Sequence, residues 1–411
     1  MNMSSKKVIA LTMVMVCSLV GCTPFAHIED NGAHATVPGP VSEAVDDNIQ
    51  EDLSPTEEEL IERQVEEWME THSLEEKVAQ MFMVTPDKLT GYSNVTAAGS
   101  VTEESIREYP VGGLIYFKEN LENPDQTKEM LDNTKKYYQE QDTIMPFLAT
   151  DEEGGLVSRI GNNSNFDLSN VGDMRDIGDT GDPQNAAQIG DTLGAYLAEI
   201  GFNMDMAPDA DVLTNPQNEI IGNRSFGTDA DLVAKMATAE ASSMRQYGVL
   251  PVYKHFPGHG ATVGDTHDGF VSIDQTLEEL YEDELVPFQE AISQDAEVIM
   301  VGHISVPNIT GSNEPSSLSH YMITDVLRGQ MGYEGVVITD AMNMGAIADN
   351  YSSADMAVQA VNAGVDIILM PVNFQKAYQA VLDAVKSGDV PEARIDESVR
   401  RILRVKYKLP E

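Results

Sequence analysis

Eight short apolar runs recur along this chain, and helical patterns fill most of the intervals between them. The runs lie at residues 81–84, 111–117, 145–149, 202–207, 249–253, 297–301, 335–339 and 365–370. The helical patterns lie at 125–139, 186–199, 229–246, 277–293 and 354–363. Apolar runs that alternate with helices are typical of a parallel sheet buried on both faces. The sequence therefore predicts an α/β fold: a (β/α)8 barrel that forms a single domain, with no second domain after it.

An open doubly wound sheet is the structural alternative to a barrel. Such a sheet often carries a glycine-rich turn that opens a helix and binds a dinucleotide. The pair Gly112 and Gly113 instead precedes a predicted strand. The dinucleotide fingerprint therefore does not fit, and no other motif in the chain indicates a cofactor.

The first residues are typical of a bacterial export signal. Lys6 and Lys7 precede an apolar run at 8–19 that is too short to span a membrane. The tetrad Leu-Val-Gly-Cys follows and resembles a lipobox, which implies that Cys22 is lipidated. We then expect an extracytoplasmic protein held at the cell membrane through its lipid anchor only. Ordinary cleavage that leaves Cys22 as a free thiol is the alternative; either cleavage removes Cys17 and with it any disulfide bond.

The chain divides into three parts with different compositions. These are a signal at 1–21, an acidic flexible linker at 22–55 and the barrel domain at 56–411. Capping-box patterns that begin at Thr56 and Ser73 predict two helices at the start of the domain. The formal net charge of −43 argues against nucleic acid and anionic lipid as partners through bulk electrostatics. The sequence makes no prediction of oligomeric state.

Polar side chains follow the predicted strands at the points where these strands end. They are Asp151, Glu152 and Glu153 after the third run, Asp209 and Asp211 after the fourth, Lys254 and His255 after the fifth, His303 after the sixth and Asp340 after the seventh. In a barrel these strand ends meet on one face, where catalytic groups lie. Chance would scatter polar residues between both ends. The clustering therefore predicts an enzyme.

The segment after the fifth run carries three histidines in a stretch rich in Gly and Pro. They are His255, His259 and His267, and Asp265 precedes the last of them by two residues. An acidic neighbour can orient an imidazole and hold its proton, which suits general acid/base chemistry near neutral pH. A metal site and histidines that bond loop backbone are the alternatives. A proline and a glycine between the first two histidines argue against the helix that would pair them as ligands.

Four segments resemble glycoside hydrolase family 3, in its β-N-acetylglucosaminidase branch. The signature is Lys-His-Phe-Pro-Gly-His-Gly at 254–260 followed by Asp-Thr-His at 265–267. Segments 151–159, 221–227 and 337–345 resemble the elements D-x-E-G-G-x-V-x-R, I-G-x-R-S-F-G and the one that bears the nucleophile. The resemblance covers about residues 57–409. It implies a retaining exo-enzyme that releases terminal β-linked N-acetylglucosamine from muropeptides or chitin-like fragments through a covalent glycosyl-enzyme.

The resemblance also implies roles for individual residues. Asp340 is the nucleophile, His267 is the general acid and base, and Asp265 orients His267. The residues at the sugar-binding positions are Asp151, Arg224, Lys254 and His255. Three of these residues have a plainer alternative: a helix cap for Asp340, a structural ion pair for Arg224, and a cap of the glycine-rich turn for Asp151.

Three further questions stay open at the level of sequence. Glu152 and Glu153 stand beside Asp151 like a metal set, but adjacent side chains diverge, so we predict no metal. A histidine acid/base repels an incoming anion less than a carboxylate does, which keeps a phosphorylase as an alternative, beside another β-glycosidase of the family and a non-catalytic sugar-binding lipoprotein. We expect Met344 to be core, while Met342 has either a core or a sugar-contact role.

Overall fold

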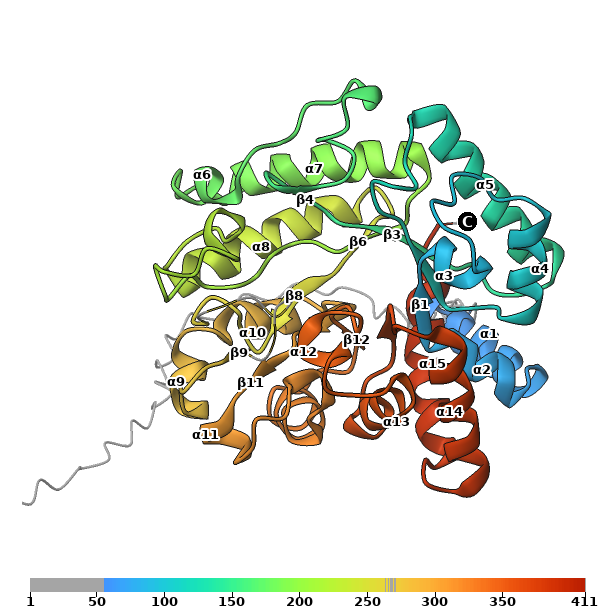
Figure 1. Ribbon diagram of the computed structural model, residues 1–411. Coiled ribbons are helices and arrows are strands. Elements are labelled where there is room, and N and C mark those ends of the chain that lie inside the picture. Colours follow the sequence, from blue (N-terminus) through green and yellow to red (C-terminus); the bar gives the residue numbers. More distant parts are fainter. Residues whose placement is uncertain (1–54, 263, 265, 267–268, 270, 411) are drawn as a thin grey trace, which may run out of the picture. The chain divides into compact units, whose positions relative to one another are not determined.

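Eight strands form the wall of a barrel in the computed structural model, which describes residues 55–262, 264, 266, 269 and 271–410. The strands are β1 (Phe82–Val84), β2 (Gly113–Ile115), β3 (Phe147–Thr150), β6 (Met204–Asp205), the two-part strand β7 (Leu250–Pro251) and β8 (Tyr253–Phe256), β10 (Val298–Val301), β12 (Val336–Thr339) and β13 (Ile368–Leu369). Figure 1 shows the helices arranged around them. Each predicted run overlaps one of these strands, so the predicted barrel is confirmed.

Parallel pairing closes the barrel. One sheet has the order β13-β1-β2-β3-β6-β7, and a second has the order β12-β10-β8. The sheets share the fifth run, which is divided between β7 and β8. A parallel bridge between Ile338 and Ile367 joins β12 to the residue before β13, and the Thr339 N–H donates to the Ile367 carbonyl at 3.0 Å. Every wall strand therefore has a neighbour on both sides.

The strands are buried because helices cover their outer side and side chains fill the barrel. Every residue of β1, β2, β3, β10 and β12 is buried. Continuous burial explains why these strands appear in the sequence as apolar runs and not as alternating patterns. Removal of this apolar surface from water is the main force that stabilises the barrel.

The helices begin where the capping residues predict. Capping boxes at Thr56 and Ser73 open α1 (Glu57–Thr71) and α2 (Leu74–Gln80). Four further predicted helices are present as α5 (Pro124–Glu140), α7 (Pro183–Ile200), α8 (Ala230–Arg245) and α13 (Ser353–Ala363). The last two helices are α14 (Phe374–Ser387) and α15 (Glu392–Tyr407). Short helices α3 (Pro86–Thr90) and α4 (Ser100–Glu108) follow β1.

The single helix predicted at 277–293 is wrong. The structure has two helices there, α9 (Leu277–Glu282) and α10 (Val286–Ser293). Pro287 lacks an N–H and its ring clashes with a helical carbonyl four residues earlier, so it fits only the first turn of a helix. The chain turns at Asp283, and a new helix starts just before the proline.

Two additional strand pairs lie at the carboxyl end of the barrel. β4 (Glu152–Gly154) and β5 (Val157–Ser158) form an antiparallel hairpin, and β9 (Val271–Ser272) pairs with β11 (Ile304–Ser305). The hairpin turns at Gly154 and Gly155, whose φ angles of 97° and 51° favour glycine. A Cβ atom on Gly154 would lie 2.7 Å from the Gly172 carbonyl oxygen. The glycines thus let the hairpin make a tight turn.

The predicted signal and the predicted linker up to residue 54, including Cys17 and Cys22, lie outside the described residues. Among the helices of the described part of the chain, none is both long enough and apolar enough to cross a membrane.

Candidate active site

A small cavity lies where the strands of the barrel end. Its volume is about 180 Å³. Its walls come from segments that follow β2, β3, β8 and β12 and from the loop before α8. The polar residues that line it are Asp151, Glu153, Arg159, Arg224, Lys254, His255, His259, Thr266 and Asp340. Residues from distant parts of the sequence therefore meet at the carboxyl face of the barrel, as the fold predicts.

Asp340 follows directly after β12 and faces this cavity. Its Oδ1 accepts a hydrogen bond from the Ala341 N–H at 2.7 Å. Burial is the largest single influence on the pKa of Asp340 and raises it, but nearby His303 and His255, together with the backbone donor, outweigh burial and lower the pKa. The side chain is therefore a carboxylate at neutral pH.

His303 supports the loop that carries Asp340. Its Nε2 lies 3.0 Å from the Ala341 carbonyl oxygen and its Nδ1 lies 2.8 Å from the Ser317 hydroxyl. The side chain is fully buried. It lies behind Asp340 and holds the backbone of that loop; the sequence located His303 at a strand end but did not assign this contact.

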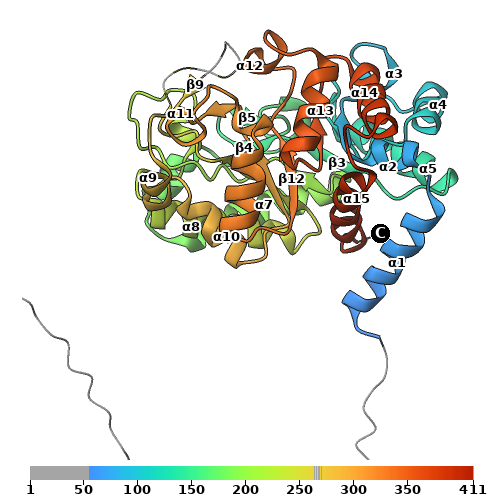
Figure 2. The ribbon, with the colours of Figure 1, turned by 90° about the horizontal axis from the view of Figure 1, so that it is seen from below.

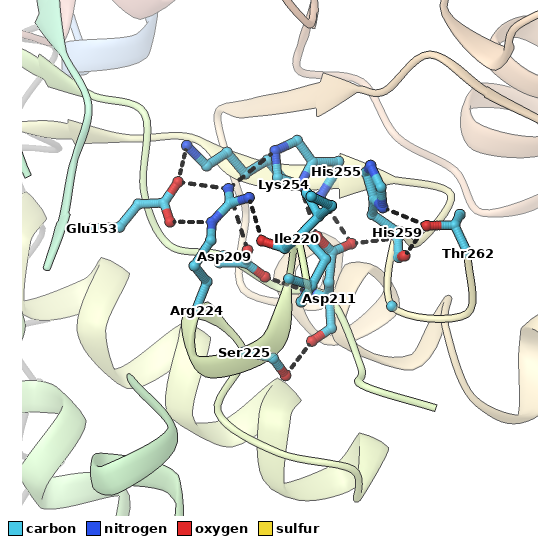
Figure 3. Close-up of polar contacts among 12 residues, drawn as sticks. Glu153, Asp209, Asp211, Ile220, Arg224, Ser225, Lys254, His255, His259 and Thr262 are labelled. Atoms are coloured by element: carbon cyan, nitrogen blue, oxygen red, sulfur yellow. Dashed lines mark hydrogen bonds and ion pairs between the residues drawn. The ribbon is translucent and has the colours of Figure 1, made fainter. Parts of the chain in front are cut away.

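Glu153 organises the cationic side of the cavity. It accepts two hydrogen bonds from Arg224, Nε to Oε2 and Nη2 to Oε1, both at 2.8 Å, and forms an ion pair with Lys254. Figure 3 shows these three side chains meeting. Burial raises the pKa of Glu153, but the two cations outweigh burial and hold the pKa far below its usual range. The same carboxylate thereby keeps both cations charged and in place.

The adjacent carboxylates Glu152 and Glu153 point to different places, as predicted. The Glu152 carboxylate accepts from the backbone N–H groups of residues 159, 160 and 161 and from the Ser158 hydroxyl. The Tyr196 hydroxyl donates to it at 2.7 Å. Glu152 therefore closes the loop after β5. Sequence reasoning assigned no site role to Glu153, although the alternation of a strand places it on the cavity side.

Asp151 stands between two cations at the mouth of the hairpin. Arg159 Nη2 lies 3.0 Å from its Oδ2 and Lys254 Nζ lies 3.5 Å from its Oδ1. Burial lowers the pKa of Lys254, but Glu153 and Asp151 outweigh it and raise the pKa. Asp151 therefore lines the cavity as the partner of two cations, and is not only a cap of the turn.

His255 is held in one tautomer by Asp211. Its Nδ1 lies 2.7 Å from Asp211 Oδ2, and its Nε2 lies 3.5 Å from Arg224 Nη2 (Figure 3). Burial, followed by the Arg224 charge, lowers the pKa of His255 to about 4. At neutral pH the imidazole is therefore uncharged. We assign its proton to Nδ1, which donates to Asp211, so that Nε2 is an acceptor.

Asp211 also fixes the backbone of the histidine loop. Its Oδ1 accepts from the N–H groups of His255 at 3.2 Å and of His259 at 2.6 Å. His259 in turn contacts the Thr262 hydroxyl through Nδ1 at 2.8 Å. Burial is the main influence that lowers the pKa of His259. Asp211, which follows the fourth wall strand β6, thus holds the start of this loop in place.

Asp209, Asp211 and His255 also place three potential metal ligands together. One atom of each lies within 4.8 Å of the others. Arg224 Nη2 lies 3.5 Å from Asp209 Oδ2 and the same distance from His255 Nε2. A permanent positive charge so close to two of the three ligands opposes a second cation, and we assign the cluster to positioning.

The structure brings together five of the predicted site residues around the cavity. They are Asp151, Arg224, Lys254, His255 and Asp340. Asp265 and His267 lie outside the described residues. Thr266 lines the cavity, and its carbonyl accepts from the Ala346 N–H at 3.0 Å. Met344 is buried, as expected, and also lines the cavity, whereas Met342 is fully buried in the core.

The fold and these groups define a class: (β/α)8-barrel proteins with an ionised carboxylate and a cationic cluster at the strand ends. The family model described as "Glycosyl hydrolase family 3 N terminal domain" matches residues 73–405. The chain belongs to glycosyl hydrolase family 3. The family resemblance seen in the sequence motifs is confirmed.

Named proteins with similar sequences or structures support the assignment to this family. Beta-hexosaminidase A of Pseudoalteromonas piscicida is 33% identical over 332 residues, which cover 75% of this chain and 55% of the relative. Beta-hexosaminidase LpqI of Mycobacterium tuberculosis is 36% identical over 277 residues, 64% of this chain and 68% of the relative. The structure of a family 3 β-N-acetylglucosaminidase from Paenibacillus sp. str. FPU-7 matches with a TM-score of 0.75 and 36% identity, over 82% of this chain and 62% of that one. The chain thus spans less than two thirds of the Pseudoalteromonas and Paenibacillus proteins.

Proposed function

We propose that the protein is a retaining exo-β-N-acetylglucosaminidase. The observation that carries this proposal is Asp340: a carboxylate kept ionised at the base of a cavity of about 180 Å³. This volume suits a single sugar ring and not a long chain. The names of the relatives, β-hexosaminidase and β-N-acetylglucosaminidase, favour a terminal β-linked N-acetylhexosamine as the substrate.

In the proposed first step, Asp340 attacks the anomeric carbon. Because Oδ1 already accepts the Ala341 N–H, Oδ2 is the better nucleophile. The bond from Oδ2 to carbon forms as the glycosidic carbon–oxygen bond breaks, and His267 gives its proton to the departing oxygen. In the second step His267 removes a proton from water, water attacks the same carbon, and the Asp340 carboxylate is released. Two displacements retain the configuration at this carbon.

The roles of His267 and Asp265 rest on the sequence motif. The two residues are proposed as acid/base and orienting partner because the Asp-x-His spacing suits an imidazole that both gives and takes a proton. The position of Thr266 in the cavity wall supports a role for this segment in the site. His267→Ala should slow poor leaving groups far more than activated aryl leaving groups. Equal losses on both substrates would contradict the acid role.

The cationic cluster is proposed to bind the sugar. Asp151, Lys254 and Arg224 offer charge-assisted hydrogen bonds to hydroxyl groups and to an acetamido oxygen. The neutral His255 offers an acceptor at Nε2. Their mutual ion pairs hold them in place before substrate arrives, which reduces the ordering cost of binding.

We also propose that Cys22 carries a lipid and that the linker holds the barrel outside the cell membrane. The support is the Leu-Val-Gly-Cys tetrad after a short apolar run. Labelling of growing cells with a radioactive fatty acid should mark the wild-type protein but not Cys22→Ser. Equal labelling of the two proteins would contradict lipidation at this position.

The activity test compares two aryl glycosides. Purified protein should release 4-nitrophenol from the N-acetyl-β-glucosaminide and much more slowly from the β-glucoside, and Asp340→Ala should lose both turnover and covalent trapping by a fluorinated substrate. A product of N-acetylglucosamine 1-phosphate in phosphate buffer would assign the protein as a phosphorylase instead. Binding of sugar without turnover of any substrate would assign it as a binding protein.

A further inference from the structure

A groove of about 630 Å³ lies at the amino ends of the strands, at the end of the barrel opposite to the catalytic cavity. We call it the α1 groove. Its wall includes Trp68 of α1, His72 just after α1, Thr143 before β3, Asn203 before β6, Tyr247 before β7 and Tyr407 at the end of α15. Figure 2 shows α1 beside α15, near the C-terminal end. The groove shares no described lining residue with the catalytic cavity.

Two polar groups in the walls of the α1 groove have no hydrogen-bond partner within the described part of the chain. They are Trp68 Nε1 and Thr143 Oγ1, both buried atoms. The Trp68 side chain belongs to a residue that is only 6% exposed. A buried polar group without a partner costs about 1–3 kcal/mol. Both atoms are shielded from solvent, so a ligand in the groove bonds them once the Trp68 and Thr143 side chains turn toward it.

The aromatic side chains of the α1 groove suit a ligand with flat apolar faces. The Trp68 and His72 rings stack with their centroids 3.9 Å apart and their planes 10° apart, and His72 Nδ1 contacts the Trp68 carbonyl at 2.8 Å. This stack fixes the edge that carries the Trp68 N–H. Tyr247 is 42% exposed, and its ring, like that of Tyr407, combines an apolar face with a polar tip.

The charges along the α1 groove favour a neutral ligand. Lys135 and Lys406 lie in its wall, and so do Glu67 and Asp142. The Lys406 Nζ is already engaged with Gln80 Oε1 at 2.7 Å and lies 5.0 Å from the centroid of the Phe147 ring. The groove wall thus carries two basic and two acidic side chains, so neither sign of charge dominates it. A pocket of this size with aromatic walls and a few convergent polar groups is typical of a small-molecule site.

We propose that the α1 groove is a second carbohydrate-binding site, which takes a neutral oligosaccharide. A sugar ring offers an apolar face to the aromatic rings and hydroxyl or acetamido oxygens to the Trp68 N–H and the Thr143 hydroxyl. A polysaccharide bound in this groove would hold the protein on that polysaccharide while the catalytic cavity at the opposite end of the barrel stays accessible to substrate. This proposal does not depend on the catalytic roles of Asp340 or His267.

Binding to the α1 groove can be followed by tryptophan fluorescence, because Trp68 is the only tryptophan in the sequence. The probe is the hexamer of β-1,4-linked N-acetylglucosamine, added to full-length Asp340→Asn protein so that the probe is not consumed. Saturable change in tryptophan emission is expected. The same titration with Lys254→Gln added should be unchanged, because Lys254 belongs to the catalytic cavity.

Two conservative variants test the polar contacts of the α1 groove. Thr143→Val removes the hydroxyl and should weaken the hexamer about fivefold, the effect of one net hydrogen bond. Trp68→Phe removes the N–H and should weaken binding similarly by calorimetry. Thr192→Val, on the exposed side of α7, is the matched control and should not change affinity. Thermal unfolding of each variant shows whether the fold is kept.

Three results would overturn the proposal. One is the absence of an emission change with the hexamer. Another is a response that disappears in Lys254→Gln, which would assign the signal to the catalytic cavity. The third is a response to inorganic phosphate in place of the hexamer, which would make the α1 groove an anion site. Unchanged affinity in both Thr143→Val and Trp68→Phe would likewise contradict the assigned contacts.

Discussion

Glu153 holds Arg224 with both carboxylate oxygens, each 2.8 Å from a guanidinium nitrogen. The third strand end thereby fixes a side chain that comes from the loop before α8. Lys254, from the fifth strand end, pairs with the same carboxylate. One buried carboxylate thus joins three separate segments of the cavity wall.

Glu153→Gln should therefore destabilise the protein and weaken substrate binding. The amide keeps the size of the side chain but leaves two buried cations without their main counter-charge. Removal of one partner of a buried pair costs about 3–5 kcal/mol, and we expect a loss of this order in the free energy of urea unfolding together with a higher KM. The control is Glu58→Gln at an exposed position of α1. Equal unfolding midpoints for the two variants would contradict the prediction.

The variant Asp209→Asn tests whether the buried side chain of Asp209 is protonated in the folded protein. Burial, followed by Asp211, raises the pKa of Asp209 to about 8, whereas an unfolded aspartate has a pKa near 3.9. Between these values the folded state holds a proton that the unfolded state lacks, so this contribution to stability is lost as the pH rises towards 8. Asparagine resembles the protonated form and has no such dependence. The stability of the variant relative to wild type should rise from pH 5 to pH 9 in urea unfolding; a constant difference would refute the assignment.

His255 should show the opposite dependence. Its pKa of about 4 in the folded protein lies below the unfolded value near 6.5. The unfolded state therefore binds the extra proton between these values, and stability gains from this group as the pH rises from about 4 to 6.5. The advantage of wild type over His255→Asn should grow across this window and be constant above it. An NMR titration of the imidazole with a midpoint near 6.5 would contradict the buried, neutral state.

Gly190→Ala should destabilise the protein although alanine favours helices. Gly190 lies in α7, where a Cβ atom would stand 2.1 Å from the Glu240 carbonyl oxygen of α8. The contact is with backbone, so the two helices would have to separate. We expect a loss of about 1–3 kcal/mol in unfolding free energy, typical of overpacking. Gly99→Ala is the control, since nothing lies within 4 Å of its Cβ position, and its change should stay within about 1 kcal/mol. A gain in stability in Gly190→Ala would show that the helices adjust freely.

Most of the wall of the barrel follows from the sequence, because parallel strands buried on both faces leave continuous apolar runs. The helix starts at Thr56 and Ser73 follow from local capping chemistry. The positions of Asp340, Lys254 and His255 follow from the rule that functional groups lie at strand ends. Each of these signals is contained in a short stretch of chain.

Other features were not predicted, in part because they depend on contacts between distant segments. The role of Glu153 requires knowing that the loop bearing Arg224 lies across from it. The break between α9 and α10 follows from Pro287, a local signal that the apolar periodicity concealed. The segment Tyr321–Gln330 forms a π-helix, for which no sequence pattern was recognised. The α1 groove arises only when α1 packs beside the amino ends of the strands.

The position of α1 has a practical consequence for anyone who wishes to attach this protein to a surface. Because α1 lines the groove at the amino ends of the strands, a bead or fusion partner joined ahead of Glu57 meets the barrel at that end. The cavity at the carboxyl ends then faces away from the support. Immobilised protein should keep access to small glycosides, whereas attachment through the β4–β5 hairpin would place the support across the entrance.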